Sequence, residues 1–352
     1  MSALPPLRPD LHIAVVRFSA LGDIVMAAAA VSALRAQFPD ARITWITSPL
    51  AHALLEGLAG VDFEVVKKPQ SLADYRALYR TFRHRHFDAV LAMQANIRIN
   101  LLYPALRAPI KLGFDRTRAR EGQWLFCNRN IPFRDEHLVD SFLSFVETLS
   151  GAPATATWNL PIGERDLAWA RERLQTLPRP WVAVHPRTSK IERNWLPERY
   201  AQMVSESVAR WRCGIVLTGG NTEAEQQQCA QLAQVAPAQT LNLCGKTTPK
   251  QLAALLSLVD ALVAPDTGAV HIARAMNTPV VGLYAVAPAT LAGPYQRSEY
   301  CVDRYSQATQ RFLGKTPEQL RWNTRVHHPD AMELIEVADV MQQLEKILEP
   351  HA

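Results

Sequence analysis

The chain has 352 residues, of which 48% are hydrophobic and 20% charged, so extended disorder is excluded and two domains are expected. Its formal net charge is +5 and its pI is about 9.0, a balance that suits anionic partners. The net charge alone does not identify the partner, which could be a nucleotide, a phosphorylated lipid, a membrane surface or a nucleic acid.

Three features predict the cellular compartment. The five cysteines contain no C-x-x-C pair, which indicates reduced thiols and leaves no readable zinc site. The small apolar segment 26–30 is similar to the end of a signal peptide, but Asp10, Arg17 and Asp23 interrupt the region before it. No apolar run has the length that a membrane-spanning helix needs. We therefore expect a soluble, cytoplasmic protein.

The first predicted element is a short apolar run at residues 13–16, which is typical of a buried strand. The chain breaks at residues 19–22 and continues as an alanine-rich helix to residue 34. Strand, tight turn and buried helix are the opening unit of a parallel α/β sheet. Asp23 falls in the first helical turn, at the edge where such sheets place ligands. The alternative is a purely structural role, in which the acid only stabilises the helix end through the helix dipole.

The same alternation continues through the first half. Further strands are predicted at residues 42–47, 63–66, 87–93 and 110–114, and helices at 71–84, 97–107 and 135–150. Because hairpin turns are missing between these elements, the pattern predicts a doubly wound parallel sheet. Residues 151–180 are rich in Pro, Ala and Thr, and include one charged helical segment at 164–175. We expect this stretch to connect two domains.

The second half repeats the rhythm. Strands are predicted at residues 181–184, 214–218, 240–243, 261–264 and 280–284, and helices at 197–210, 222–234, 249–257, 269–276 and 331–348. The expected fold is α/β, with Rossmann-like domains at residues 1–177 and 178–352 that face each other across a central cleft. The last helix is a candidate to pack back on the first domain.

Residues 264–271 form a second stretch with a chemical signature. A buried strand ends at Pro265, and Asp266 or Thr267 can cap the helix that follows. Gly268 allows a ligand to approach the backbone closely, and free N–H groups at a helix start bind phosphate. His271 lies one turn further on. The pattern predicts a pyrophosphate site, although ordinary helix caps have the same composition.

Two motifs carry a family resemblance. R-x-S-x-L-G-D at residues 17–23 and D-T-G-x-x-H-x-A at residues 266–273 resemble glycosyltransferase family 9, the ADP-heptose:lipopolysaccharide heptosyltransferases. Residues 87–90 with Gln94, residues 113–115 leading to Arg120, and His137 are similar to the heptosyltransferase I branch. The resemblance implies a GT-B fold and inverting transfer of L-glycero-D-manno-heptose from ADP-heptose to the Kdo region of the lipopolysaccharide inner core.

The resemblance also implies roles for individual residues. Asp23 would be the general base that takes the proton of the acceptor hydroxyl. The helix start at Gly268 and nearby cations would stabilise the departing ADP. The implied donor-binding residues are Thr188, Lys190, Arg193, Glu223, Asp266, Thr267, Gly268 and His271, and the implied acceptor-binding residues are Ser19, Gly22, Arg120 and His137.

The sequence departs from the family pattern in two places. The family usually has a lysine just before a Trp-Pro pair, whereas here Arg193 stands at that spacing before Trp195 and Lys190 is the nearest lysine. We favour Arg193 over Lys190 for the diphosphate, because an arginine contacts two oxygens at once. Residues 284–288 stand where the family more often has a Gly-Pro-Thr sequence. The ligand contacts that this loop makes in the family are therefore not assigned to this chain.

Several motifs are missing from the sequence. A complete G-x-x-x-x-G-K-[ST] loop, a G-x-G-x-x-G after the first strand and a D-x-D pair are all lacking. We therefore expect no cofactor and no strict need for a divalent metal, with ADP-heptose as a substrate. The basic clusters at residues 80–86 and 116–120 are expected to be solvated, with Arg120 meeting the acceptor and Arg116 and Arg118 assisting at a phosphorylated lipid surface.

Alternative functions remain open at this stage. The chain could use another nucleotide sugar or acceptor, or it could be a nucleotide-binding regulator without turnover, which would have no need of Asp23. A nucleic-acid-binding protein is disfavoured, because no recognisable module accompanies the basic clusters. The expected acceptor is Kdo-lipid A at the cytoplasmic face of the inner membrane, and the oligomeric state is not predicted.

Overall fold

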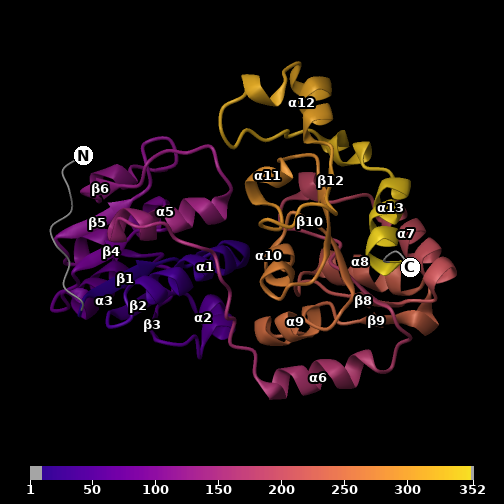
Figure 1. Cartoon of the computed structure of the whole chain (residues 1–352), viewed down its shortest axis with the longest axis horizontal. Helices are drawn as coiled ribbons and strands as arrows, with labels where there is room; N and C mark the ends of the chain where they lie inside the picture. Colours follow the sequence, from indigo (N-terminus) through magenta and orange to yellow (C-terminus); the bar gives the residue numbers. More distant parts are fainter. Residues whose placement is uncertain (1–9, 350–352) are drawn as a thin grey trace. The chain divides into compact units, whose positions relative to one another are not determined.

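The computed structural model describes residues 10–349, which divide into two compact units (Figure 1). Unit 1 is Met1–Pro161 and unit 2 is Ile162–Ala352. Each unit contains a six-stranded parallel sheet. The predicted α/β fold with two Rossmann-like units is therefore confirmed. Within residues 10–349, no helix combines the length and the apolar character needed to cross a membrane.

The sheet of unit 1 has the order β3-β2-β1-β4-β5-β6. Its strands are β1 (His12–Val16), β2 (Arg42–Thr47), β3 (Val61–Val65), β4 (Ala89–Leu91), β5 (Ile110–Gly113) and β6 (Arg129–Asn130). Its helices are α1 (Leu21–Gln37), α2 (Pro49–Leu55), α3 (Leu72–Phe82), α4 (Ile97–Asn100) and α5 (Leu138–Ser150), with short 3₁₀ turns at Tyr103–Ala105 and Gln123–Leu125. The predicted helix at 97–107 is interrupted because Pro104 lacks the N–H that a helix interior requires.

Helix α1 is the structural centre of unit 1. Ala33, the alanines at residues 27–30 and the side chains of Ile24, Val25 and Val31 are buried, and the helix packs along α5. The indole of Trp158 donates a hydrogen bond of 2.8 Å to the carbonyl of Val25. Small side chains allow this close packing on both sides of the helix, which explains why an alanine-rich segment is buried. The start of α1 is thereby held rigidly at the end of β1.

The sheet of unit 2 has the order β12-β11-β10-β7-β8-β9. Its strands are β7 (Trp181–Val184), β8 (Gly214–Leu217), β9 (Thr240–Asn242), β10 (Ala261–Pro265), β11 (Val280–Tyr284) and β12 (Val302–Asp303). Its helices are α6 (Glu164–Leu174), α7 (Pro197–Trp211), α8 (Glu223–Ala233), α9 (Pro249–Leu256), α10 (Gly268–Ala275), α11 (Ala289–Ala292), α12 (Tyr305–Leu313) and α13 (Val337–Leu348), with a 3₁₀ turn at Ile191–Arg193.

The boundary between the units differs from the predicted one at residues 177 and 178. It falls between Pro161 and Ile162, because α6 packs on α9 and so joins unit 2. The buried residues of α6, Ala170 and Leu174, form its contact side, although the helix is otherwise highly charged. The last helix, α13, packs against α7 and the β10–β12 part of the sheet in unit 2.

Candidate active-site residues

The turn between β1 and α1 places Asp23 at the carboxyl edge of the unit 1 sheet, where its strands end. The Asp23 carboxylate accepts a hydrogen bond of 3.0 Å from the N–H of Ala20 and forms an ion pair with Arg17. Arg17 also donates to the carbonyl of Met93 over 2.6 Å and lies 5.3 Å from the Phe142 ring centroid. The Asp23 side chain keeps 29% of its surface exposed. It is therefore fixed in position yet open to a reactant.

Ser19 is the centre of a second set of polar contacts in this turn. Its hydroxyl accepts hydrogen bonds of 3.2 Å from Lys68 and from Gln94, and the Gln94 side chain also accepts the N–H of Phe18 over 2.6 Å. Burial, followed by the charges of Arg98 and Arg17, lowers the pKa of Lys68. The predicted residue Ser19 is thus hydrogen-bonded to Lys68, a residue that the sequence analysis did not predict.

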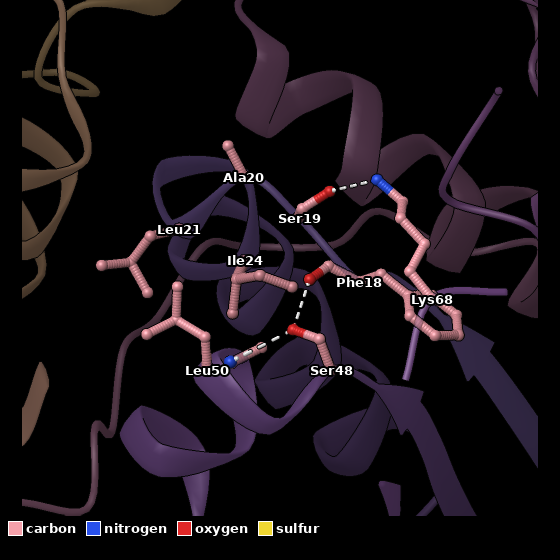
Figure 2. A pocket seen from close by; sticks show the side chains of 9 residues that line it. Phe18, Ser19, Ala20, Leu21, Ile24, Ser48, Leu50 and Lys68 are labelled. Carbon is pink, nitrogen blue, oxygen red and sulfur yellow. Dashed lines mark hydrogen bonds between the residues drawn. The ribbon is translucent and has the colours of Figure 1, made fainter. Parts of the chain in front are cut away.

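Figure 2 shows a cavity beside this turn, with a volume of about 330 Å³. Its wall is mainly apolar and comes from the start of α1 and the start of α2, including Leu21, Ile24 and Leu50. Lys68 and Ser19 supply its polar rim. Lys68 lies in the irregular segment just after β3, far from Ser19 in the sequence, so only tertiary structure brings the two side chains together.

The loop after β5 carries Arg120. Asn100 donates hydrogen bonds to the backbone carbonyls of Arg120 and Glu121, over 3.2 and 2.9 Å, which fixes the loop backbone. The Arg120 side chain is exposed. His137 caps α5, and its Nδ1 accepts the N–H of Val139 over 3.0 Å. Gly22 is buried within the first turn of α1, where it has no side chain to offer a ligand.

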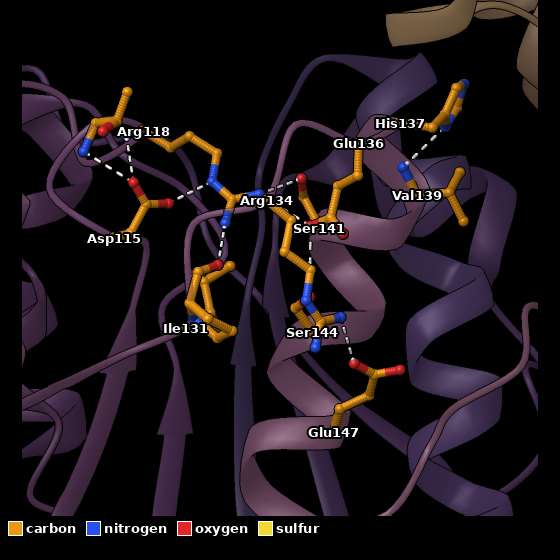
Figure 3. A network of polar contacts seen from close by, with 12 residues as sticks. Asp115, Arg118, Ile131, Arg134, Glu136, His137, Val139, Ser141, Ser144 and Glu147 are labelled. Carbon is orange, nitrogen blue, oxygen red and sulfur yellow. Dashed lines mark hydrogen bonds and ion pairs between the residues drawn. The ribbon is translucent and has the colours of Figure 1, made fainter. Parts of the chain in front are cut away.

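The expectation that Arg118 lies on a solvated face is wrong. Arg118 is buried and pairs with Asp115, with Glu136 over 3.2 Å, with Ser141 and with the carbonyl of Pro132 over 2.6 Å (Figure 3). A guanidinium with so many acceptors connects the loop after β5 to the start of α5. Burial raises the pKa of Glu136, an effect that the hydrogen bond from Arg118 opposes. Arg118 therefore has a structural role.

In unit 2, the start of α10 lies directly after β10. The Asp266 carboxylate pairs with Arg193 over 2.8 Å, and Arg325 lies 3.8 Å away. The Thr267 hydroxyl accepts the N–H of Ala269 over 3.0 Å, so it caps the helix that begins at Gly268. Two cations near one carboxylate and a positive helix end leave an excess of positive charge. Such an arrangement can hold a diphosphate.

Three further candidates for donor binding, Thr188, Lys190 and His271, differ in their contacts and burial. The Thr188 hydroxyl accepts the N–H of Lys190 over 2.8 Å and donates to the carbonyl of Lys190 over 3.1 Å, which closes a tight turn. The Lys190 side chain is exposed in this turn, and it is Arg193 that pairs with Asp266. His271 is buried within α10.

Glu223 is exposed at the first position of α8, while its neighbour Glu225 organises the loop before that helix. Glu225 accepts the N–H of Gly220 over 3.0 Å and also binds Thr222. Burial tends to raise the pKa of Glu225, but these hydrogen bonds outweigh it and leave the pKa below its usual value. The spacing of Thr222 and Glu225 is a capping box that can be read from the sequence.

Besides Lys68, two further residues contact predicted site residues but were not among the predicted ones themselves. Arg17 stands in the N-terminal motif and pairs with Asp23, so its role was readable from the motif. Arg325 lies far from Asp266 in the sequence and carries no local signal. Among residues 10–349, no group of three or more His, Cys, Asp or Glu side chains could hold a metal ion.

Two Rossmann-like units in one chain, each with a six-stranded parallel sheet, are typical of GT-B glycosyltransferases. The family model for glycosyltransferase family 9 (heptosyltransferase) matches residues 75–320. The lipopolysaccharide core heptosyltransferase OpsX of Haemophilus influenzae is 31% identical over 335 residues, which cover 95% of this chain and 96% of that protein.

Solved structures agree with this fold. A glycosyltransferase of family 9 from Veillonella parvula has a TM-score of 0.78 at 18% identity, and covers 98% of this chain and 99% of its own. The Escherichia coli ADP-heptose lipopolysaccharide heptosyltransferase II has a TM-score of 0.74 at 19% identity, with 97% and 99% covered. The chain belongs to glycosyltransferase family 9, and it is a glycosyltransferase with the GT-B fold.

Proposed function

We propose that this chain transfers L-glycero-D-manno-heptose from ADP-heptose to the Kdo region of the lipopolysaccharide inner core, with inversion at the anomeric carbon. The observation that carries the proposal is the fixed and accessible carboxylate of Asp23 at the start of α1. The chain's membership of glycosyltransferase family 9 and its likeness to a lipopolysaccharide core heptosyltransferase support the substrate class. The E. coli heptosyltransferase II, which is described as an ADP-heptose enzyme, supports ADP-heptose as the donor.

Asp23 is the proposed general base. The acceptor oxygen forms a bond with the anomeric carbon, the bond from that carbon to the diphosphate breaks, and the hydroxyl proton passes to Asp23. A positioned base contributes about 10²–10⁴-fold to the rate. The ion pair with Arg17 and the hydrogen bond from the N–H of Ala20 hold the carboxylate in a fixed position.

The departing ADP is proposed to rest at the start of α10. Arg193 and Arg325 flank Asp266 there, and the helix that Thr267 caps begins at Gly268 with the positive end of its dipole at this site. Positive charge placed where negative charge develops lowers the barrier of the chemical step. We include Thr188, Lys190, Glu223, Gly268 and His271 in the proposed donor site by family resemblance.

The acceptor is proposed to bind at the carboxyl edge of unit 1. Arg120 presents an exposed guanidinium that can contact a carboxylate through two hydrogen bonds. Ser19, Gly22 and His137 complete the proposed acceptor site, with Lys68 as an added cation beside Ser19. Because the acceptor is anchored in a bilayer, we propose that the protein works at the cytoplasmic surface of the inner membrane.

A reconstituted assay tests the proposal. Purified protein is incubated with a panel of nucleotide sugars and Kdo-lipid A, and the products are identified by mass spectrometry. Heptose addition to Kdo, with an inverted anomeric configuration, is the expected result. Transfer of another sugar, or addition to another acceptor, would contradict the substrate assignment, and ADP binding without any turnover would indicate a regulator. We also expect full activity in EDTA, since no metal step is proposed.

The role of Asp23 needs a matched control. Asp23→Asn is expected to lower kcat by about two orders of magnitude or more with ADP affinity nearly unchanged. Asp74→Asn is the control, because Asp74 occupies the same position in α3 and also accepts the N–H of the residue that caps its helix. If the two variants lose equal activity, Asp23 is only a helix-capping residue.

A further inference from the structure

Exposed hydrophobic side chains are unevenly distributed between the units. Of the twelve large hydrophobic side chains that are exposed among residues 10–349, nine belong to unit 1. Scattered single cases need no explanation, but a group on neighbouring elements does. Six of the nine lie on α3, on α4 and the residue that caps its end, and on the segment that follows β5. They are Leu72, Tyr79, Ile97, Leu101, Trp124 and Leu125, which together we call the unit 1 apolar surface.

Hydrogen bonds connect the elements that carry the unit 1 apolar surface. The Tyr75 hydroxyl donates to the carbonyl of Arg98 over 2.9 Å, which joins α3 to α4. The N–H of Ile97 donates to Glu121 over 2.6 Å, which joins α4 to the segment after β5. Leu72 and Tyr79 are seven residues apart on α3, so they lie on one face of that helix. Ile97 begins α4, and Leu101 is the residue that caps its end, with its N–H bonded to the carbonyl of Ile97. The side chains therefore form a neighbouring set.

Arginines lie among these apolar side chains. Arg76, Arg98, Arg116 and Arg120 are exposed on the same three elements, and the Arg116 guanidinium lies 5.7 Å from the Trp124 ring centroid. The three acids on these elements are used within the protein, and one of them, Asp115, pairs with the buried Arg118. Asp74 accepts backbone N–H groups at the start of α3, and Glu121 accepts that of Ile97. The unit 1 apolar surface is consequently basic as well as apolar.

We propose that the unit 1 apolar surface docks on an anionic lipid bilayer. Tryptophan, tyrosine and leucine beside arginines are the composition of segments that lie in a membrane interface. Helix α4 and the segment 114–125 follow the carboxyl ends of β4 and β5, at the same sheet edge as the turn that carries Asp23. This docking deepens the proposed function, because it brings that edge to the membrane in which the acceptor is anchored.

Vesicle binding by the full chain tests the docking without any sugar substrate. Wild-type protein is expected to bind vesicles that contain phosphatidylglycerol and to bind pure phosphatidylcholine vesicles far less. The double variant Trp124→Ser/Leu125→Ser should lose at least tenfold in partitioning, because both side chains leave the interface. Leu313→Ser is the matched control, since Leu313 is an exposed hydrophobic residue of unit 2. Equal binding by wild type and the double variant would overturn the proposal.

Charge is tested separately. Arg98→Gln/Arg116→Gln should weaken binding to phosphatidylglycerol vesicles by about fivefold per arginine and reduce the dependence on salt. The matched pair Arg297→Gln/Arg321→Gln on unit 2 should change neither. If sedimentation instead shows that Trp124→Ser/Leu125→Ser dissociates a dimer while vesicle binding persists, the surface is an interface between copies and the docking is refuted.

The proposed function and the docking can fail independently. Vesicle partitioning requires neither ADP-heptose nor a Kdo acceptor, so a failed transfer assay does not affect it. With transfer established, Trp124→Ser/Leu125→Ser should reduce kcat/KM for an acceptor held in vesicles and leave kcat/KM for a soluble, deacylated acceptor near the wild-type value. A loss of activity on both acceptors would show that these residues act within unit 1 and not at the membrane.

Discussion

Replacing Arg118 by methionine should destabilise unit 1 strongly. The guanidinium binds Asp115, Glu136, Ser141 and the carbonyl of Pro132, and its side chain is only 2% exposed. Without it, two carboxylates that are 7% and 13% exposed lose their shared counter-ion. Removing one partner of such a buried group costs about 3–5 kcal/mol, because the remaining charges stay desolvated. For a unit of this size, the midpoint of thermal unfolding should fall by roughly 6–20 °C.

Thermal and urea unfolding of the full chain measure this effect. Arg116→Met is the control, because Arg116 is exposed two positions earlier and should cost no more than about 0.5 kcal/mol. Adding Glu136→Gln to Arg118→Met should recover part of the loss, since one of the two unpaired charges is then removed. A free energy of unfolding for Arg118→Met within about 1 kcal/mol of wild type would refute the reasoning.

Three further predictions concern the two units. Arg193→Ala should weaken ADP binding by roughly 10- to 100-fold in calorimetry, with partial recovery in Arg193→Lys, because a charge-assisted contact is lost; unchanged affinity would remove Arg193 from the donor site. Arg120→Ala should raise the acceptor KM more than the donor KM in steady-state assays, and equal effects would argue against acceptor contact. Burial lowers the pKa of His185 to about 4, so the unfolded chain binds an extra proton as the pH falls below about 6.5. Stability should therefore decrease by about 1–2 kcal/mol between pH 7 and pH 5, and His185→Gln should show a smaller decrease in the same unfolding measurement.

The sequence by itself determined the elements and the class of the protein. Apolar runs of strand length, alternating with helical periods, predicted parallel sheets because such strands are buried on both faces. The helix starts at Asp23 and Gly268 were readable for a local reason, since capping and helix-dipole effects depend on residues within one turn. The two motifs at these helix starts also carried the family resemblance, which the family match confirmed.

Only the tertiary structure decided which polar residues lie inside and which outside. Arg116, Arg118 and Arg120 alternate along one loop and look equivalent in sequence, yet Arg118 alone of the three is buried, because the start of α5 supplies its acceptors. Lys68 reaches Ser19 and Arg325 approaches Asp266 from distant parts of the chain. The burial and pairing of a charge depend on neighbours that the fold brings together, and no local pattern encodes them.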